Sequence, residues 1–209
     1  MTIVPIAPPA AVLDEFRALL QAARESGDAE PTAMTLATAS ADGNISARTV
    51  LLKDVDARGF VFYSNCNSNK GRDLQENPRA ALLFLWKALQ VSPEGDTGRQ
   101  VQAKIEGQVE TVTAREADDY FASRPRESQI GAWASMQSET LDSREILTRR
   151  IAEFTGKFEG VAVPRPAHWS GFRVLPNMIE FWFGAPFRLH ERVRHELIDG
   201  SWQTRLLFP

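Results

Sequence analysis

The fold is constrained most by a series of short apolar segments whose connections are too short to contain a helix. Residues 34–39 and 45–53 flank Ala41-Asp-Gly-Asn44, which is a strong signal for a tight turn. A polar turn at residues 54–59 then leads into a third segment, residues 60–64. Parallel neighbours need a crossover of about a dozen residues or more, so this spacing predicts an antiparallel meander.

Further extended segments follow, one group in the middle of the chain and another at its end. Residues 79–86 are apolar enough for a central strand, and residues 101–112 alternate between apolar and polar side chains. Residues 92–98 between them read as a turn-rich loop without core residues. The remaining expected strands cover residues 169–175, 178–183, 187–192 and 201–207.

The first half of the chain carries two helical patterns. A Pro- and Ala-rich segment at residues 1–11 is expected to be irregular. From Val12 to Ala23, apolar side chains recur on one helical face. Ser68 can cap a short helix over residues 70–76, because a serine oxygen accepts a hydrogen bond from a free backbone N–H of the first turn.

Three more helices are expected between the two groups of strands. Thr113 begins a capping box that leads into a helix through Ser123, and Pro125 should end it. Residues 126–134 form a second short helix, and Ser143 caps a third. The expected buried stripe of that third helix is Ile146, Leu147, Ile151 and Phe154.

This order of elements predicts the fold class. Strands first, helices in the middle and strands last indicate an α+β fold, mainly β, built on an antiparallel barrel. The chain has 209 residues, which fits a single domain over residues 1–209 with a core large enough to be stable.

Charge and cysteine content narrow the function. A net charge of -3 provides no broad basic field, so nucleic acid and an anionic membrane surface are not expected partners. Cys66 is the one cysteine, which excludes an intrachain disulfide and suits a reducing compartment. No metal-ligand spacing, secretory signal or membrane-length apolar run is present, so we expect a cytoplasmic protein without a metal.

A first group of residues suggests a phosphate site. It comprises Arg48-Thr-Val-Leu-Leu-Lys53, Tyr63-Ser64 and Ser68-Asn-Lys70, which place cations and hydroxyls near the ends of neighbouring strands. Phosphate recognition uses fixed cations with short hydroxyl or backbone donors, and a helix start adds free N–H groups. The alternative is that Arg48, Lys53 and Lys70 are unrelated surface charges.

A second group lies at the end of an expected helix. Tyr120 and Arg124 are four residues apart and would share a helix face, while Pro125 can turn the chain so that Ser128 returns beside them. A phenol, a guanidinium and a hydroxyl suit a second phosphate pocket. Alternatively, Arg124 serves the last carbonyl groups of the helix.

A third group lies near the C-terminus. In an extended segment over residues 187–192, Arg188, His190 and Arg192 would share one face, which suits an anionic, planar ligand. The alternative is an edge strand with its charges in solvent. Trp182 precedes this run, whereas the other tryptophans are expected in the core, and Gln137-Ser138 is uninformative alone.

Together these segments resemble the pyridoxine/pyridoxamine 5′-phosphate oxidase family. The likeness runs from about Pro31 to the C-terminus, and its most specific parts are Ser123-Arg-Pro-Arg-Glu-Ser-Gln-Ile-Gly-Ala-Trp133 and Arg188-Leu-His-Glu-Arg192. Its other parts are Arg48 to Lys53, Phe62-Tyr-Ser-Asn65, Gln137-Ser138, Trp169-Ser-Gly-Phe-Arg173 and Glu180-Phe-Trp182. The resemblance implies a split β-barrel of about six to eight strands with flanking helices, and a homodimer with FMN at the subunit interface.

The resemblance also implies roles for individual residues. Arg188 and His190 would be catalytic, over the pyridine ring. The implied FMN contacts are Arg48, Thr49, Val50, Leu51, Leu52, Lys53, Tyr63, Ser64, Lys70, Gln102, Gln137, Ser138, Trp182 and Arg192. The implied substrate contacts are Lys53, Tyr120, Arg124, Ser128, Arg188, Leu189 and His190.

The implied reaction is hydride transfer from C4′ of pyridoxine or pyridoxamine 5′-phosphate to flavin N5, followed by reoxidation with O2 to give H2O2 and pyridoxal 5′-phosphate. His190 would orient the ring rather than act as an acid or base, because the adjacent Arg188 disfavours its cationic form. The rival functions are another split-barrel flavin oxidoreductase and a non-catalytic binder of FMN or pyridoxal 5′-phosphate.

The sequence departs from the family pattern at several positions. Asn69 stands where the family usually has an arginine near the FMN phosphate. The hairpin over residues 87–101 is long, so Gln90 or Gln100 could replace Gln102 as the flavin contact. The N-terminal segment is short, and the chain ends one residue later than is usual in the family.

Overall fold

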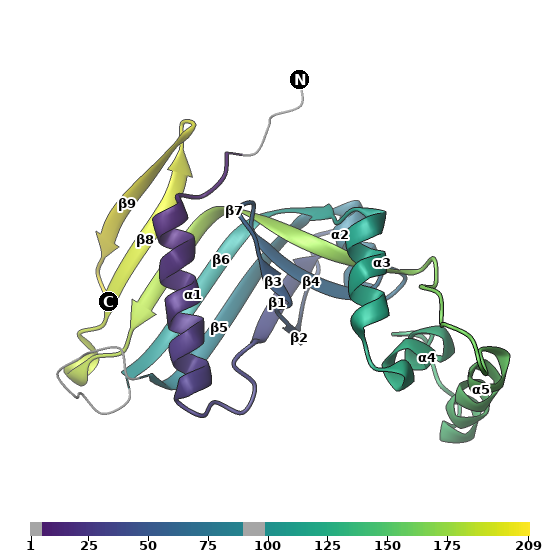
Figure 1. Ribbon diagram of the computed structural model, residues 1–209. Coiled ribbons are helices and arrows are strands. Elements are labelled where there is room, and N and C mark those ends of the chain that lie inside the picture. The colour runs from purple at the N-terminus through teal and green to yellow at the C-terminus, as the bar shows by residue number, and fades with distance from the viewer. Residues whose placement is uncertain (1–5, 90–98) are drawn as a thin grey trace.

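The protein is an antiparallel, curled β-sheet flanked by helices, as the computed structural model shows (Figure 1). The structure describes residues 6–89 and 99–209. Gln90, the expected loop at residues 92–98 and the first five residues of the expected irregular segment therefore lie outside the described residues.

Nine strands form one sheet within the described ranges. Their order is β2-β1-β5-β6-β7-β4-β3, with β8 on the far part of β7 and β9 beside β8. All pairings are antiparallel. The strands are β1 (Ala33–Ala39), β2 (Ile45–Leu51), β3 (Asp54–Val55), β4 (Phe60–Asn65), β5 (Arg79–Leu89), β6 (Arg99–Thr111), β7 (Trp169–Phe183), β8 (Glu191–Ile198) and β9 (Ser201–Leu207).

The antiparallel split barrel predicted from the sequence is confirmed, but the meander is shorter than expected. β1 and β2 form a hairpin, whereas β4 pairs with β7 rather than with β2. A backbone hydrogen bond from Lys53 N–H to the Val61 carbonyl, 2.8 Å long, joins the chain after β2 to β4. β4 therefore closes the curl of the sheet and brings the ends of β2 and β4 together.

The two strands expected at residues 169–175 and 178–183 are one long strand, β7. Its pairing with β6 shifts register between Glu106 and Gly107, and Gly107 lies opposite Pro176. A Cβ atom on Gly107 would come within 2.0 Å of the Leu175 carbonyl oxygen, so only glycine allows this approach. The proline is thus accommodated at a bulge instead of ending the strand.

The helices are α1 (Ala10–Glu25), α2 (Asn69–Glu76), α3 (Ala114–Ser123), α4 (Arg126–Ala134) and α5 (Arg144–Lys157). The capping box at Thr113 and the Ser68 cap of α2 are confirmed. The expectation of an irregular segment through residue 11 is wrong at its end, because α1 already begins at Ala10. α1 covers one part of the sheet (Figure 1), where Phe16 packs against Phe60, Phe84 and Trp86.

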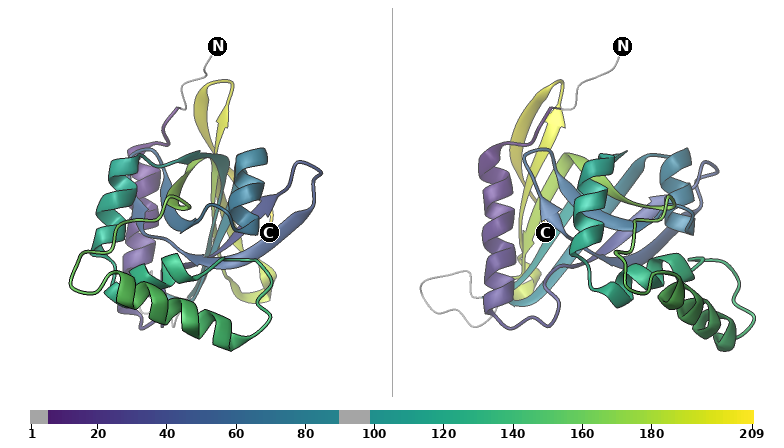
Figure 2. Two further views of the ribbon diagram at one scale, coloured as in Figure 1. Left: turned by 90° about the vertical axis from the view of Figure 1, so that its right-hand side faces the viewer. Right: turned by 45° about the vertical axis from the view of Figure 1, so that its right-hand side comes forward.

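The expected buried stripe of α5 is wrong. None of its residues is fully buried, and Ile151 is 41% exposed. The reason is the position of the helix, since α4 and α5 project beyond the end of the sheet (Figure 2). α5 packs against α4 and not against the barrel, so its apolar face is only half covered.

Candidate active site

Two of the three groups of residues found in the sequence line a single cavity of about 780 Å³. Its walls come from β2, β4, the start of α2, the end of α3, the start of α4 and the segment after α4. The predicted site residues that line it are Arg48, Thr49, Val50, Leu51, Lys53, Tyr63, Ser64, Lys70, Tyr120, Arg124, Ser128, Gln137 and Ser138. Arg48, Lys53 and Lys70 are therefore not unrelated surface charges.

Leu52 is the exception in the β2 segment. It is 4% exposed and belongs to the main hydrophobic core rather than to the cavity wall. Its backbone N–H donates to the Thr32 carbonyl at 2.9 Å. A bulky apolar side chain between two cavity-lining neighbours, Leu51 and Lys53, anchors this edge of the cavity to the core.

Lys70 is the most deeply buried cation of the cavity. It is 8% exposed, and its Nζ donates to Ser68 Oγ and to Gln137 Oε1, each at 3.0 Å. Burial lowers the pKa of the Lys70 ammonium group, and the nearby Arg48 guanidinium lowers it further. Within the described part of the chain both of its hydrogen-bond partners are neutral. Because no carboxylate neutralises the Lys70 ammonium group there, it is available to bind an anion.

The start of α2 explains how Lys70 comes to be buried. Ser68 Oγ accepts a hydrogen bond from Gly71 N–H at 3.3 Å, so the helix begins directly at the cavity. A Cβ atom on Gly71 would lie 2.2 Å from the Cys66 carbonyl oxygen. The absence of a side chain at Gly71 thus lets the first turn of α2 lie against the loop that follows β4.

Arg48 is fixed by contacts on the neighbouring strand. Its Nη1 donates to the Leu36 carbonyl at 3.2 Å and to Thr38 Oγ1 at 2.7 Å. Asp73 Oδ2 lies 3.9 Å from Arg48 Nη2, and Thr38 also donates to that carboxylate. Burial lowers the pKa of Arg48, while Asp73 acts in the opposite direction.

Asn69 interacts with the segment after α4. Its backbone N–H donates to Ser138 Oγ at 3.2 Å, and its side-chain oxygen accepts from Arg72 Nη2 at 2.6 Å. Arg72 also contacts Glu139 and does not line the cavity. Ser138 has a left-handed φ of 77°, which turns the segment toward α2. Gln137-Ser138, uninformative in the sequence, thus completes the wall beside Lys70.

An aromatic stack forms the opposite wall. The rings of Tyr63 and Tyr120 are stacked with centroids 4.0 Å apart, and Tyr63 is stacked on Trp169 at 5.4 Å. The guanidinium carbon of Arg124 lies 4.8 Å from the Trp169 ring centroid. Trp169 was expected only in the core, and it is indeed buried, but it also lines the cavity. Its position at the first residue of β7 gave no signal of this second role.

The Arg124 side chain does not serve the last carbonyl groups of α3, as the alternative reading of the sequence would have it. Arg124 is the C-cap of α3 with extended backbone, so it does not share a helix face with Tyr120 as expected, although both line the cavity. Gln129 Nε2 donates to the Phe121 and Ala122 carbonyls at 2.9 and 3.2 Å. Within the described residues, Arg124 Nη1 is buried without a hydrogen-bond partner. An amide therefore serves the helix end and leaves the guanidinium for a ligand.

The third group of predicted residues lies elsewhere on the chain. Gln102 on β6 is opposite Trp182 on β7, and Trp182 is opposite Arg192 on β8. The His190 ring centroid lies 4.5 Å from that of Trp182. None of these residues, nor Arg188 or Leu189, lines the cavity described above.

The extended segment expected at residues 187–192 is wrong at residues 187–190, and only Glu191 and Arg192 are extended, at the start of β8. Phe183 pairs with Glu191, so the residues between them connect β7 to β8 and cannot form a strand. Pro186 begins a short 3-10 turn, and Phe187 and Arg188 adopt left-handed φ values of 57° and 63°. The shared face of Arg188, His190 and Arg192 therefore does not follow from strand geometry.

Other contacts fix the side chains of this third group. Ala185 N–H donates to His190 Nδ1 at 3.1 Å. Arg192 donates through Nε and Nη2 to Glu180 Oε1, at 2.9 and 2.7 Å, while Arg194 binds the other carboxylate oxygen. Glu180 is nearly buried between these two arginines, and its pKa is lowered by their hydrogen bonds, against the effect of burial. Arg192 is thus held firmly at the strand start.

Comparison with protein families and known structures identifies the chain. Residues 13–158 match the family model described as pyridoxamine 5′-phosphate oxidase, and residues 169–209 match the pyridoxine 5′-phosphate oxidase C-terminal dimerisation region. The chain belongs to the pyridoxamine 5′-phosphate oxidase family. This confirms the resemblance drawn from its sequence.

Curated members of this family are similar over nearly their whole length. A pyridoxine/pyridoxamine 5′-phosphate oxidase of Xylella fastidiosa strain 9a5c is 58% identical, over 96% of this chain and 93% of its own. One from Xanthomonas oryzae pv. oryzae is 57% identical, over 96% of this chain and 98% of its own.

Solved structures agree on the fold. PhzG from Burkholderia lata 383, determined with tetrahydrophenazine-1-carboxylic acid, matches with a TM-score of 0.81 and 34% identity, over 98% of this chain and 94% of its own. An FMN binding protein from Nostoc punctiforme matches with a TM-score of 0.70 at 13% identity, over 99% and 100%, which supports the fold alone.

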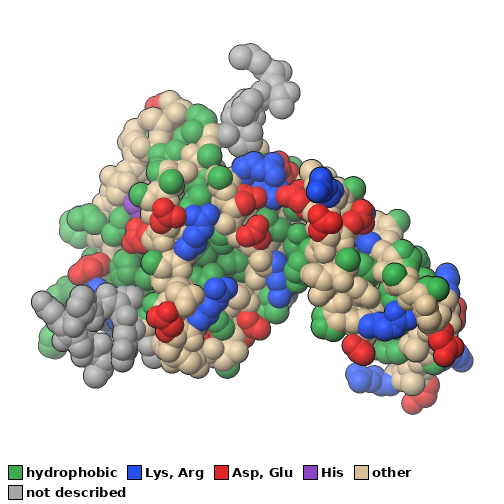
Figure 3. Space-filling view, in the orientation of Figure 1, with side chains coloured by type: hydrophobic (Ala, Val, Ile, Leu, Met, Phe, Trp, Pro, Cys, Tyr) green, Lys and Arg blue, Asp and Glu red, His purple; other side chains and the backbone are tan. Residues whose placement is uncertain are grey.

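No helix among the residues that the structure describes is long and apolar enough to cross a membrane. They also contain no cluster of three or more His, Cys, Asp or Glu side chains placed to hold a metal ion. On the face shown in Figure 3, acidic and basic side chains are interspersed, in keeping with the net charge of -3.

Proposed function

We propose that this chain is an FMN-dependent oxidase that converts pyridoxine or pyridoxamine 5′-phosphate to pyridoxal 5′-phosphate, with O2 as acceptor and H2O2 as product. The main support for the proposal is that two desolvated cations line the same cavity. Lys70 has neutral partners only, and Arg124 keeps a buried Nη1 without a partner among the described residues. One cavity with two such positions suits two phosphorylated ligands.

The cavity fits FMN at its α2 end. Its volume of about 780 Å³ lies in the range of small-molecule and cofactor sites. Arg48, Lys70 and Ser138 would hold the FMN phosphate beside the start of α2, where the helix dipole also favours an anion. FMN, when bound, supplies the hydride acceptor and passes the electrons to O2. Asn69 provides no charge here, so Arg48 and Lys70 carry the electrostatic part of phosphate binding.

The other end of the cavity suits the substrate phosphate. Arg124, Tyr120 and Ser128 supply a guanidinium, a phenol and a hydroxyl, and Lys53 lies on the wall between the two ends. Trp169 supports the Arg124 guanidinium from one face, so its donors point in fixed directions. Burial lowers the pKa of Arg124, which shows a cost of desolvation that an anionic phosphate would offset.

The third group of residues supports a homodimer. Gln102, Trp182, Arg188, His190 and Arg192 do not line the cavity of their own chain. They belong to β6, β7, β8 and the turn at residues 184–190, largely within the matched dimerisation region at residues 169–209. In the proposed dimer this group completes the cavity of the partner subunit, where Arg188 and His190 would orient the pyridine ring.

The tautomer of His190 supports an orienting role. Its Nδ1 accepts the Ala185 N–H, so a neutral ring carries its proton on Nε2. Nε2–H is then a hydrogen-bond donor to substrate and has no lone pair for proton abstraction. Protonation of Nδ1 would break the contact with Ala185.

A reduction experiment tests the proposal. The purified protein is loaded with FMN and mixed with pyridoxine 5′-phosphate without oxygen, and the flavin absorbance is followed. We expect bleaching, and then stoichiometric H2O2 and pyridoxal 5′-phosphate when air is admitted. A bound flavin that pyridoxine and pyridoxamine 5′-phosphate never reduce would refute the proposal and favour a non-catalytic binder.

A second candidate function has one observation in its favour. The structural match to PhzG extends over nearly the whole chain and shows that this fold also holds tetrahydrophenazine-1-carboxylic acid. An oxidase of such a tricyclic acid has no need of a phosphate pocket at Arg124. Reduction of the flavin by tetrahydrophenazine-1-carboxylic acid, but not by the phosphorylated pyridines, would support this alternative.

A further inference from the structure

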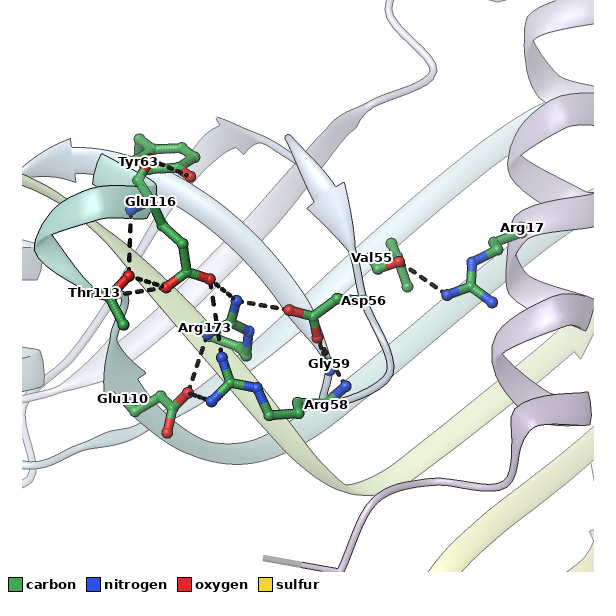
Figure 4. Close-up of polar contacts among 10 residues, drawn as sticks. All are labelled: Arg17, Val55, Asp56, Arg58, Gly59, Tyr63, Glu110, Thr113, Glu116 and Arg173. Atoms are coloured by element: carbon green, nitrogen blue, oxygen red, sulfur yellow. Dashed lines mark hydrogen bonds and ion pairs between the residues drawn. The ribbon is translucent and has the colours of Figure 1, made fainter. Parts of the chain in front are cut away.

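A buried arginine outside the cavity joins the sheet to the helix that carries the substrate pocket. Arg173 on β7 is 2% exposed. Its guanidinium points toward Asp56, Glu110 and Glu116 (Figure 4). Its Nη2 lies 2.6 Å from both Asp56 Oδ2 and Glu116 Oε1, and its Nη1 donates to Glu110 Oε1 at 3.1 Å. The more exposed Arg58 also pairs with two of these carboxylates, Glu110 and Glu116.

Glu116 is the branch of this network that belongs to a helix. One of its carboxylate oxygens accepts from the Thr113 backbone N–H and hydroxyl, both at 2.7 Å, and completes the capping box of α3. The other oxygen binds Arg173. A single side chain therefore both starts the helix and ties its first turn to β7.

The same turn contacts the aromatic wall of the cavity. The Tyr63 hydroxyl donates to the Glu116 carbonyl at 3.4 Å (Figure 4). The Tyr63 ring also stacks on Tyr120, one turn further along α3. A Cβ atom on Gly171, two residues before Arg173, would lie 2.6 Å from the Tyr63 ring. β7 thus meets the tyrosine pair at Gly171 and the helix start at Arg173.

We infer that Arg173 and Glu116 are positioning residues for the substrate phosphate pocket. They set the distance between the first turn of α3 and the sheet, and so the placement of Tyr120 and Arg124 at the other end of the helix. This inference rests on the proposed function, since it assigns the substrate phosphate to those two side chains. Neither positioning residue lines the cavity.

The energetics of this network favour a positioning role for Arg173 and Glu116 over a role in stability alone. Arg173 is buried, while its three carboxylate partners stay 30–36% exposed, so the cost of desolvating the guanidinium offsets much of its attraction to them. Arg173 moreover keeps its Nε without a partner among the described residues, which makes it a poor choice for stability alone. What the ion pairs supply is direction, because the guanidinium fixes carboxylates from three separate segments at once.

The test compares Glu116→Gln with Glu110→Gln. Glutamine at residue 116 keeps the capping box but loses the charged contact with Arg173. Glu110→Gln makes the same chemical change on the same arginine, but on β6 rather than on α3. Both variants are loaded with FMN, and their dissociation constants for pyridoxal 5′-phosphate and for unphosphorylated pyridoxal are measured.

We expect Glu116→Gln to raise the Kd for pyridoxal 5′-phosphate about tenfold, which corresponds to the loss of part of one charge-assisted hydrogen bond. The Kd for unphosphorylated pyridoxal should not change. KM for pyridoxine 5′-phosphate should rise by the same factor at nearly constant kcat, and Glu110→Gln should match the unsubstituted protein. Equal effects of the two variants, equal loss of both ligands, or no loss of pyridoxal 5′-phosphate binding in Glu116→Gln would overturn the inference. Tight binding without turnover in the unsubstituted protein would instead refute the proposed function.

Discussion

Lys70 offers the sharpest test of the flavin end of the cavity. The Lys70→Met substitution removes the ammonium group and keeps a flexible apolar chain of similar length. In the FMN-free protein the lysine is a desolvated charge whose hydrogen-bond partners among the described residues are Ser68 and Gln137. Removing it sacrifices two hydrogen bonds of about 1 kcal/mol each, but it also removes the cost of desolvating a cation, which is several kcal/mol for an unpaired ion.

These magnitudes predict opposite effects on stability and on binding. Without FMN, the Lys70→Met variant should melt at the same temperature as the unsubstituted protein or higher. With FMN, loss of one charge-assisted hydrogen bond to phosphate costs about 1.5–3 kcal/mol, which is about a 10- to 150-fold rise in Kd. Riboflavin, which lacks the phosphate, should bind both proteins equally.

The assay combines differential scanning fluorimetry of the FMN-free proteins with titration of flavin fluorescence. Lys157→Met on α5 is the matched control, because Lys157 is an exposed lysine outside the cavity. A melting temperature lowered by more than about 4 °C, roughly 1–2 kcal/mol for a domain of this size, would show that Lys70 stabilises the fold. An FMN Kd within threefold of the unsubstituted protein would show that Lys70 does not bind the phosphate.

Three further predictions follow from contacts elsewhere in the molecule. Gly71→Ala should raise the Kd for FMN more than tenfold, because the new Cβ meets a backbone oxygen at 2.2 Å and displaces the first turn of α2. Flavin titration checks this, with Gly156→Ala as the control, and an unchanged Kd would contradict it. Phe16→Ala should lower the free energy of unfolding by about 3–5 kcal/mol, because the ring is 0% exposed. Denaturant titration measures this loss, and a value below about 1 kcal/mol would mean that the core collapses around the cavity left by the ring. Hydrogen bonds from Arg173 and Thr113 lower the pKa of Glu116 to about 2 in the folded protein, against about 4.3 in the unfolded chain. The contribution of the ionised Glu116 to stability is therefore complete above about pH 4.3 and is lost as the pH falls toward 2. The melting curves of the unsubstituted protein and Glu116→Gln should therefore converge over that range, and a constant difference down to pH 2 would refute the assignment.

The sequence predicted the local elements of the fold well where one pattern determined them. The tight turn after β1, the Ser68 cap and the Thr113 capping box each depend on neighbours in the chain, and all three occur as expected. The placement of β4 beside β7 depends on contacts between residues about a hundred positions apart, which no local pattern contains. The same limit explains α5, whose apolar stripe has no sheet beneath it.

The candidate site shows a similar division. Residue types and the family resemblance identified the cations and hydroxyls that line the cavity. They did not reveal Trp169, Gln129 or Arg173, because a tryptophan in a strand, an amide in a helix and an arginine in a strand have no local signature of such roles. The turn at Phe187 and Arg188 was missed for a different reason, since its alternating residues resemble a strand although both backbones are left-handed.

Gln129 has a consequence for anyone who would transfer this pocket to another scaffold. Grafting Lys53, Tyr120, Arg124 and Ser128 alone would copy every side chain expected to contact the substrate phosphate. It would also leave the last carbonyl groups of the grafted helix unsatisfied, and the nearest donor able to reach them would be the grafted arginine itself. The amide that bonds Phe121 and Ala122 in the natural chain is therefore part of the minimal transferable unit, although it would never appear in a list of ligand contacts.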